Sequence, residues 1–194
     1  MSEQFCIIDT ETSGLFDWSR PADAEGQPRL ASLALILLRG DLSLEAEISV
    51  LVRPEGWSMG EDAQRVHGLS NDRLLKEGIP VRYALALYLT ALNEGRVIVA
   101  HNTQYDTKIM RGELRRLGLP DEHERTQTIC TMRSLTDVCK LPKARGGYKF
   151  PRLSEACEIV LSRPHVDAHG ALPDARACVD LFRVMRERGF EVAA

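Results

Sequence analysis

Long hydrophobic runs are absent from this 194-residue sequence. The longest nearly continuous run, Leu30 to Leu38, has nine residues and includes Ser32, whereas a membrane-spanning helix needs about 20. The amino terminus also lacks the basic start and long apolar stretch of a secretory signal peptide. We therefore expect a cytoplasmic protein without a membrane partner.

Closely spaced cysteines are missing as well. The five cysteines are odd in number and widely separated, and no two of them form a CxxC pair. This usage is typical of reduced core thiols rather than of a disulfide framework. A zinc-binding protein built on cysteines and histidines remains an alternative, but the paired spacing that such sites use is not present.

The composition shows neither the polar bias of disorder nor a strong charge. Hydrophobic residues make up 44% and charged residues 27% of the chain, which are ordinary values for globular proteins. The length predicts a single domain over residues 1–194. The net charge of −3 does not by itself indicate a polyanionic partner, although it can hide an uneven distribution of basic residues.

Strand-like patterns come first along the chain, and strands and helices alternate later. This order predicts an α/β domain with a mixed sheet. Apolar and β-branched runs indicate strands, and apolar residues at helical spacing indicate helices. The predicted strands are Phe5–Asp9, Ala31–Leu38, Ile48–Val52, Val97–Ala100 and Ile129–Met132, and the predicted helices are Pro80–Asn93, Tyr105–Leu117, Leu153–Leu161 and Asp174–Arg188.

Two acids stand at the end of the first predicted strand. Asp9 and Glu11 are two residues apart, so in an extended chain their side chains project to the same face, roughly 7 Å apart. Two such carboxylates repel each other unless they share divalent cations, which prefer oxygen ligands. A strand that simply ends in a polar loop would carry the same pattern, so this pair alone is a weak signal.

Two further acids open the buried stripes of predicted helices. The residues at helical spacing after Asp106 and Asp174 are mostly apolar, and Pro173 fits a first helical turn. Each acid could simply cap its helix. Because both point toward the core side, however, they need a counter-charge. Together with Asp9 and Glu11 they could hold two metal ions.

A histidine precedes the last of these acids by five residues. His169 lies in a predicted loop before Asp174 and could titrate near neutral pH, as a base that activates water must. A lone loop histidine is usually just solvated. Nearby His165 has the same chemistry but lacks this spacing.

These residues form three ordered motifs that resemble those of the DEDDh exonucleases. This DnaQ-like family includes the proofreading subunit of bacterial replicative polymerase and stand-alone relatives. The motifs are Asp9-Thr10-Glu11-Thr12-Ser13-Gly14, His101-Asn102-Thr103-Gln104-Tyr105-Asp106 and His169-Gly170-Ala171-Leu172-Pro173-Asp174, and Val66-His67-Gly68-Leu69-Ser70 resembles a segment that the family carries between the first two. The resemblance covers about residues 5 to 186.

The resemblance implies a ribonuclease H-like fold with a mixed five-stranded sheet flanked by helices. It implies a 3′–5′ exonuclease that releases nucleoside 5′-monophosphates from single-stranded or frayed 3′ ends. Two Mg²⁺ or Mn²⁺ ions would be held by Asp9, Glu11, Asp106 and Asp174, and His169 would be the general base. In a sister branch a tyrosine four residues before the last acid replaces the histidine; this position is Gly170 here, which excludes that branch.

Family position also suggests contacts to the terminal nucleotide by Thr12, Leu15, Asp62 and His67. For Leu15 and His67, ordinary packing is an equally good interpretation. Tyr105 stands where the family often has phenylalanine, which would add a hydroxyl near the site. The polar stretch Asp17–Pro28 is a predicted loop that could shape access of the strand.

The segment between Val138 and Ser154 has basic and aromatic side chains but no acid. Such a segment can follow phosphates and stack bases, and we expect Lys143, Arg145 and Lys149 to bind substrate. A solvated mobile loop is the alternative, because Gly146-Gly147 and two prolines also predict a plain connection. The segment contains Lys140, Lys143, Arg145, Lys149 and Arg152, interleaved with Tyr148 and Phe150.

Other functions stay open at this point. DNA is the expected substrate, but an exoribonuclease of the same family would have the same motifs, because recognition of the 2′-hydroxyl depends on pocket geometry. A catalytically silent nucleic-acid-binding module would be expected to have lost an acid or the histidine. An endonuclease or resolvase would not be expected to keep the His169–Asp174 spacing. A polymerase partner is possible but not indicated, and the short segment after the last predicted helix favours a stand-alone enzyme.

Overall fold

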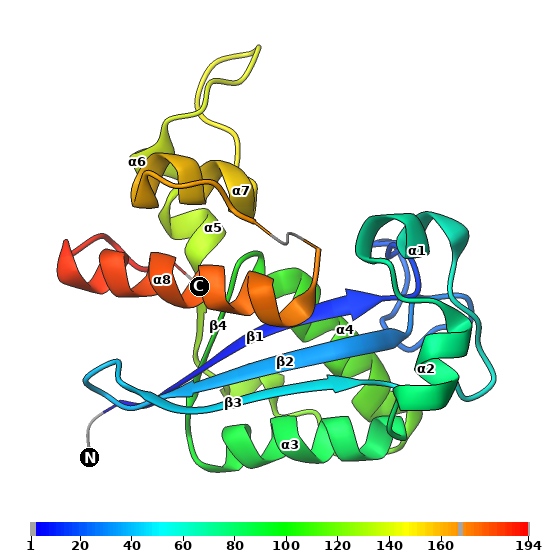
Figure 1. The fold of residues 1–194 in the computed structure, drawn as a ribbon. Helices are drawn as coiled ribbons and strands as arrows, with labels where there is room; N and C mark the ends of the chain where they lie inside the picture. Colours follow the sequence, from blue (N-terminus) through cyan, green and yellow to red (C-terminus); the bar gives the residue numbers. More distant parts are fainter. Residues whose placement is uncertain (1–2, 167–168, 194) are drawn as a thin grey trace.

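A computed structural model describes residues 3–166 and 169–193. Its centre is a five-stranded mixed sheet with the strand order β3-β2-β1-β4-β5 (Figure 1). β1 pairs antiparallel with β2 and parallel with β4, β2 pairs antiparallel with β3, and β4 pairs parallel with β5. The strands are β1 (Phe5–Thr12), β2 (Leu30–Leu38), β3 (Leu44–Leu51), β4 (Val97–Ala100) and β5 (Thr128–Cys130). The predicted mixed sheet is confirmed.

Helices cover both faces of the sheet. α8 packs on β1 and β2 from one side, whereas α3 and α4 lie on the other side (Figure 1). The longer helices are α3 (Val81–Asn93), α4 (Thr103–Arg116) and α8 (Ala171–Glu187). The shorter ones are α1 (Glu61–His67), α2 (Asn71–Glu77), α5 (Thr131–Ser134), α6 (Thr136–Cys139) and α7 (Leu153–Ala156), with a 3₁₀ turn at His123–Arg125 and a π-helical turn, η2, at Cys157–Leu161.

The alternation of β1 explains why both faces are covered. Cys6 and Ile8 point into the core that β1 shares with α3 and α4, whereas Phe5 and Ile7 point into the core under α8. All four side chains are fully buried. Successive side chains of a strand point to opposite faces, so a continuous apolar run is what a central strand between two helical layers requires.

Several element boundaries differ from the sequence prediction. The strand predicted over Ile129–Met132 ends at Cys130, because Thr131 already begins α5. The sequence analysis did not predict α1 and α2. Both are helices of seven residues, and α1 has no buried residue while α2 buries only Leu74, so neither carries the apolar stripe on which helix prediction depends.

The pairing of the cysteines, the candidate metal ligands and the character of the helices can be compared with the sequence predictions. All five cysteines are buried free thiols. Within the described residues, candidate metal ligands gather in one group, which contains only carboxylates, so the zinc alternative gains no support. No helix in this part of the chain combines the length and the apolar character needed to cross a membrane.

Candidate active site

Carboxylates from β1, α4 and α8 meet at the carboxyl end of β1. Asp9, Glu11 and Asp174 each place one carboxylate oxygen within 4.8 Å of the others. Asp9 and Glu11 continue the face of β1 that carries Phe5 and Ile7, which is the face covered by α8. Asp9 and Glu11 therefore lie on one face of β1, as their spacing predicted. α8 contributes Asp174 on the same face.

Asp106 reaches the same site from the other face of β1. It lies in the first turn of α4 and is buried. The hydroxyl of Thr10 donates a hydrogen bond of 2.8 Å to its Oδ1 atom, because Thr10 alternates with Asp9 and points toward α4. The core-side orientation predicted for Asp106 is confirmed.

Burial and repulsion from neighbouring carboxylates make Asp9, Glu11 and Asp106 costly to ionise. Burial, followed by repulsion from the Asp174 and Asp106 carboxylates, raises the pKa of Glu11 from 4.5 to about 7. Burial also raises the pKa of Asp106 from 3.8 to about 7, against the opposing hydrogen bond from Thr10. The pKa of Asp9 is raised well above its usual value by burial and by the Asp106, Asp174 and Glu11 carboxylates.

The donor set fits divalent cations. Among the described residues, no lysine or arginine forms an ion pair with Asp9, Glu11 or Asp106. Buried carboxylates need a counter-charge, and hard cations such as Mg²⁺ take carboxylate oxygens as ligands. Asp9, Glu11 and Asp106 therefore offer ligands of the kind that a divalent cation prefers, and no described lysine or arginine pairs with them instead.

We expect the metal-free protein to lose stability as the pH rises from about 4 to about 7. In this window the native state binds more protons than the unfolded chain, because Glu11 and Asp106 titrate near 7 only when folded. Stability then falls with rising pH by several kcal/mol, and levels off only when the folded-state carboxyl groups, Asp9 included, are ionised. Urea unfolding in EDTA at several pH values measures this, and Asp106→Asn should reduce the slope. A metal-free protein that becomes more stable over this window would contradict the expectation.

The two histidines near Asp174 occupy different environments. The Nε2 atom of His165 donates a hydrogen bond of 2.6 Å to Oδ1 of Asp174, and the side chain is 6% exposed. His169 is exposed and has a left-handed backbone with φ of 69°. It lies close enough to His67 to lower the pKa of that ring, after the larger effect of burial. The spacing in the sequence selected His169 but did not predict the hydrogen bond between His165 and Asp174.

The residues suggested for the terminal nucleotide line one cleft of about 530 Å³ beside the acids. Thr12, Leu15, Asp62 and His67 all border it, together with Glu11 and Tyr105. Leu15 is 87% exposed, which contradicts the alternative that it is a packing residue. Asp62 is exposed and forms an ion pair with Arg65. The structure thus gathers these four residues next to Glu11.

Hydrogen bonds fix the floor of this cleft. His67 accepts a bond from the backbone N–H of Leu69 through Nδ1, so Nε2 carries the proton and donates to the carbonyl oxygen of Thr12 at 3.1 Å. The hydroxyls of Tyr105 and Thr12 lie 2.8 Å apart, and Tyr105 also donates to the carbonyl of Gly14. The extra hydroxyl expected of Tyr105 therefore ties α4 to the end of β1.

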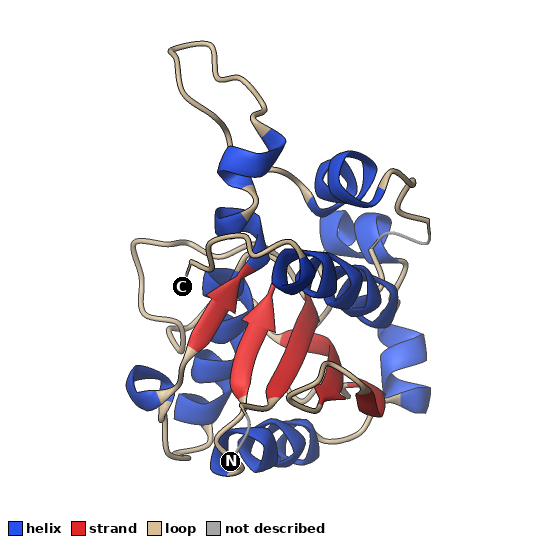
Figure 2. Ribbon diagram, turned by 90° about the vertical axis from the view of Figure 1, so that its left-hand side faces the viewer, coloured by secondary structure: helices blue, strands red, loops and turns tan. Residues whose placement is uncertain are grey.

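The basic segment before the third motif forms a loop that projects away from the body of the molecule (Figures 1 and 2). Pro142 and Tyr148 pair as an antiparallel bridge, and Gly146 and Gly147 turn the chain with positive φ angles. Lys149, which the sequence analysis expected to bind substrate, forms an ion pair: its ammonium group binds the carboxylate of Glu155 at 2.6 Å.

The remaining cations of the loop have other surroundings. Arg152 also binds Glu155, so one carboxylate offsets two cations at the base of the loop. The ammonium group of Lys143 lies 5.8 Å from the ring centre of Phe150. No ion pair is formed by Lys143 or Arg145 within the described residues.

The predicted loop Asp17–Pro28 is held against α4. The buried amide of Gln27 bonds to backbone groups of Asp17 and Pro21, and Arg116 donates to the carbonyl of Ala22 at 2.9 Å. Gly112 of α4 is required at this contact, because a Cβ atom there would lie 2.7 Å from the same carbonyl oxygen. The loop is thus an ordered wall beside the site.

Comparisons with known proteins agree with this geometry. A family model described as Exonuclease, RNase T, matches residues 6–182. Over 99 residues the chain is 30% identical to a PolC-type DNA polymerase III of Caldanaerobacter subterraneus subsp. tengcongensis, covering 51% of this chain and 6% of that protein. Over 186 residues it is 26% identical to the "Putative bifunctional exonuclease/endonuclease protein MT2247" of Mycobacterium tuberculosis, covering 95% and 26%.

Solved structures share the fold. Exonuclease I of E. coli, in complex with a dT13 oligonucleotide, superposes with a TM-score of 0.75 at 16% identity, over 96% of this chain and 42% of that one. A moderately thermophilic exonuclease I from Methylocaldum szegediense gives 0.70 at 21% identity, over 96% and 41%. The chain therefore spans less than half of each relative. Through its family match it belongs to the RNase T exonuclease family of DEDDh, DnaQ-like nuclease domains.

Proposed function

We propose that this nuclease domain is a metal-dependent 3′–5′ exonuclease that hydrolyses single-stranded DNA ends to nucleoside 5′-monophosphates in the cytoplasm. The observation that carries the proposal is the group of four partly or fully buried carboxylates, of which Asp9, Glu11 and Asp106 form no ion pair with a lysine or arginine in the described part of the chain. In the proposal Asp9, Glu11, Asp106 and Asp174 hold two Mg²⁺ or Mn²⁺ ions. When bound, paired ions of this kind stabilise negative charge on the attacking and leaving oxygens of a phosphodiester.

The remaining roles fall to the protein's own groups. His169 takes the proton from the attacking water as the general base. The exposed position of His169 and its proximity to His67 leave it open to the cleft side of the site. His165 donates a hydrogen bond to Asp174 and would release that oxygen when a cation binds.

The cleft beside Glu11 receives the terminal nucleotide. Leu15 presents an exposed apolar side chain on which a base can pack, while Thr12 and His67 shape the floor through their mutual hydrogen bond. Asp62 borders the open side of the cleft. A cleft that combines an apolar side chain for the base with polar groups for the sugar and phosphate fits a single unpaired nucleotide.

A single-stranded substrate is favoured by two further observations, the first of which points to DNA. The E. coli exonuclease I structure with the same fold contains a dT13 oligonucleotide, and we transfer that ligand class to this chain as part of the proposal. The projecting loop supplies Lys143 and Arg145 next to Tyr148 and Phe150, a combination that binds phosphates and stacks bases. Because Lys149 is paired with Glu155, we assign it the weakest part in this contact.

The test is degradation of 5′-labelled single-stranded DNA and RNA oligonucleotides with Mg²⁺, with Mn²⁺ or with EDTA. We expect a ladder that shortens from the 3′ end with either metal and no cleavage in EDTA. Faster cleavage of RNA than of DNA would indicate that RNA is the preferred substrate. Internal cuts would indicate an endonuclease, and tight binding without any cleavage would indicate a silent binding module.

A further inference from the structure

A second cleft, of about 410 Å³, lies on the outer face of α4, where the Asp17–Pro28 loop meets this helix. It does not contain any of the four acids. Its lining combines an aromatic side chain with several cations. The aromatic, cationic and histidine side chains of the lining are Trp18, Arg20, Lys108, Arg111, Arg115 and His123.

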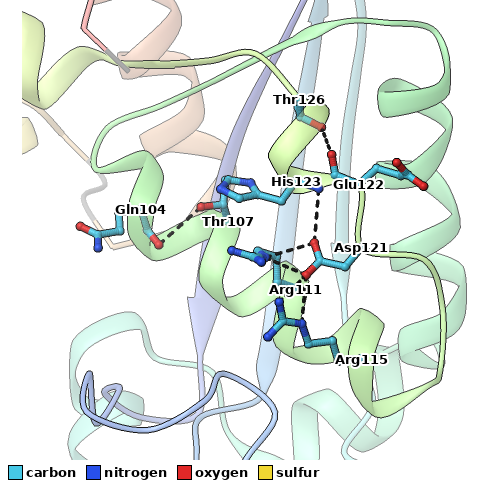
Figure 3. Close-up of polar contacts among 8 residues, drawn as sticks. All are labelled: Gln104, Thr107, Arg111, Arg115, Asp121, Glu122, His123 and Thr126. Atoms are coloured by element: carbon cyan, nitrogen blue, oxygen red, sulfur yellow. Dashed lines mark hydrogen bonds and ion pairs between the residues drawn. The ribbon is translucent and has the colours of Figure 1, made fainter.

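One face of α4 supplies the cations. Gln104, Lys108, Arg111 and Arg115 follow each other at intervals of three or four residues, so they form a stripe along one side of the helix. Figure 3 shows Arg111 and Arg115 on this side, facing Asp121 and His123 of the following segment. Asp106 occupies the opposite, buried side of the same helix. α4 thus carries an active-site acid inward and a cationic stripe outward.

The positive charge of the stripe exceeds the negative charge of Asp121, the acid that it contacts. Arg111 and Arg115 both bind the carboxylate of Asp121, at 2.8 and 2.7 Å, which leaves one net positive charge in this trio. Arg111 uses only its Nε atom for these bonds. In the described part of the chain, its two terminal nitrogens form no hydrogen bond. Two planar N–H donors of this kind match the oxygens of a phosphate.

The aromatic wall connects the cleft to the active site. Half of the Trp18 side chain is exposed, and the ammonium group of Lys108 lies 4.4 Å from its ring centre. The Trp18 ring is also 6.4 Å from that of Tyr105, whose hydroxyl bonds to Thr12 in the nucleotide cleft. Phe16 packs against both rings, so a cluster of three aromatic side chains lies between the two clefts.

We propose that this cleft is a second contact site for single-stranded nucleic acid. A base stacks on Trp18 while a phosphate binds to Lys108, Arg20 and the free donors of Arg111, a pairing of stacking and charge that is typical of single-strand binding. The inference rests on the proposed function, because the strand held here is the one whose 3′ end lies in the first cleft. Its consequence is an affinity that grows with the length of the strand.

The test measures how affinity depends on length. We would use Trp18→Ala and Lys108→Gln, each in an Asp106→Asn background that keeps the strand intact, with labelled single strands of two to about 15 nucleotides. We expect about tenfold weaker binding of the longest strand to each variant, and a smaller difference as the strand shortens. Arg82→Gln and Tyr83→Ala serve as controls, because they remove a comparable exposed cation–aromatic pair from α3.

The fluorescence of Trp18 reports directly on binding in this cleft. In a Trp57→Phe protein, Trp18 is the one remaining tryptophan, and we expect long strands but not dinucleotides to quench its fluorescence. Unchanged affinity in both variants together with unquenched Trp18 would overturn the inference. Failure of the proposed function gives a different result, namely that the protein without Asp106→Asn cleaves no strand at all, whatever Trp18 reports.

Discussion

Asp106→Asn is expected to reduce turnover of a single-stranded oligonucleotide by about three orders of magnitude in Mg²⁺. The substitution keeps the size of the side chain and an oxygen that can accept the 2.8 Å hydrogen bond from Thr10. It removes a charged ligand from the proposed metal site. Loss of the stabilisation that a bound cation gives to the reaction costs about 4 kcal/mol, which corresponds to this factor.

The measurement is kcat with saturating metal and strand, accompanied by thermal unfolding to show that the variant is folded. Asp137→Asn is the matched control, because it makes the same change of charge at an exposed helical position. We expect that control to stay within about twofold of the unsubstituted protein, as is usual for surface substitutions. If Asp106→Asn kept nearly full turnover over a range of Mg²⁺ concentrations, the carboxylate site would not be the catalytic one.

The second large effect distinguishes the two histidines. We expect His169→Ala to lower kcat by a factor of about 10²–10⁴, the range for loss of a general base, and His165→Ala to lower it less than tenfold. His165 is nearly buried and binds an oxygen of Asp174, which the bound metal would need. Removing His165 should therefore change the Mg²⁺ concentration for half-maximal activity more than it changes kcat.

The pair of variants is decisive because both side chains lie near the same acid. Metal titrations of both variants, at a pH above the histidine range, separate an effect on metal binding from an effect on proton transfer. The opposite order, with a large loss of kcat in His165→Ala and little in His169→Ala, would assign the base to His165. The spacing argument from the sequence would then be wrong at that residue.

The sequence was most informative where local geometry is periodic. The alternation in β1 was enough to place Asp9 and Glu11 on one face, and helical spacing was enough to turn Asp106 toward the core. The mixed sheet followed from the order of strand-like and helix-like segments. In each case a repeating backbone fixes the direction of a side chain, so the pattern of residue types is sufficient.

Sequence reasoning failed where loops decide the contacts. The approach of His165 to Asp174 and the pairing of Lys149 with Glu155 depend on backbone paths that no periodicity describes. The cleft on α4 needs the Asp17–Pro28 loop, whose position depends on Gln27 and on the close approach to Gly112. The basic stripe of α4 was visible in the sequence, but nothing there indicated what would face it.

The alternation of β1 also sets how this site tolerates changes in chain length. Threonine and acid alternate over Asp9, Thr10, Glu11 and Thr12, and each type serves a different helix. Suppose that one residue before Asp9 were deleted while the preceding residues of β1 kept their places in the core. The hydroxyl groups would then point to the face where the carboxylates now lie, and the carboxylates would point to the opposite face. Deleting two would restore the phase. Changes of an even number of residues therefore keep each side chain on its own face of the strand, whereas changes of an odd number cannot.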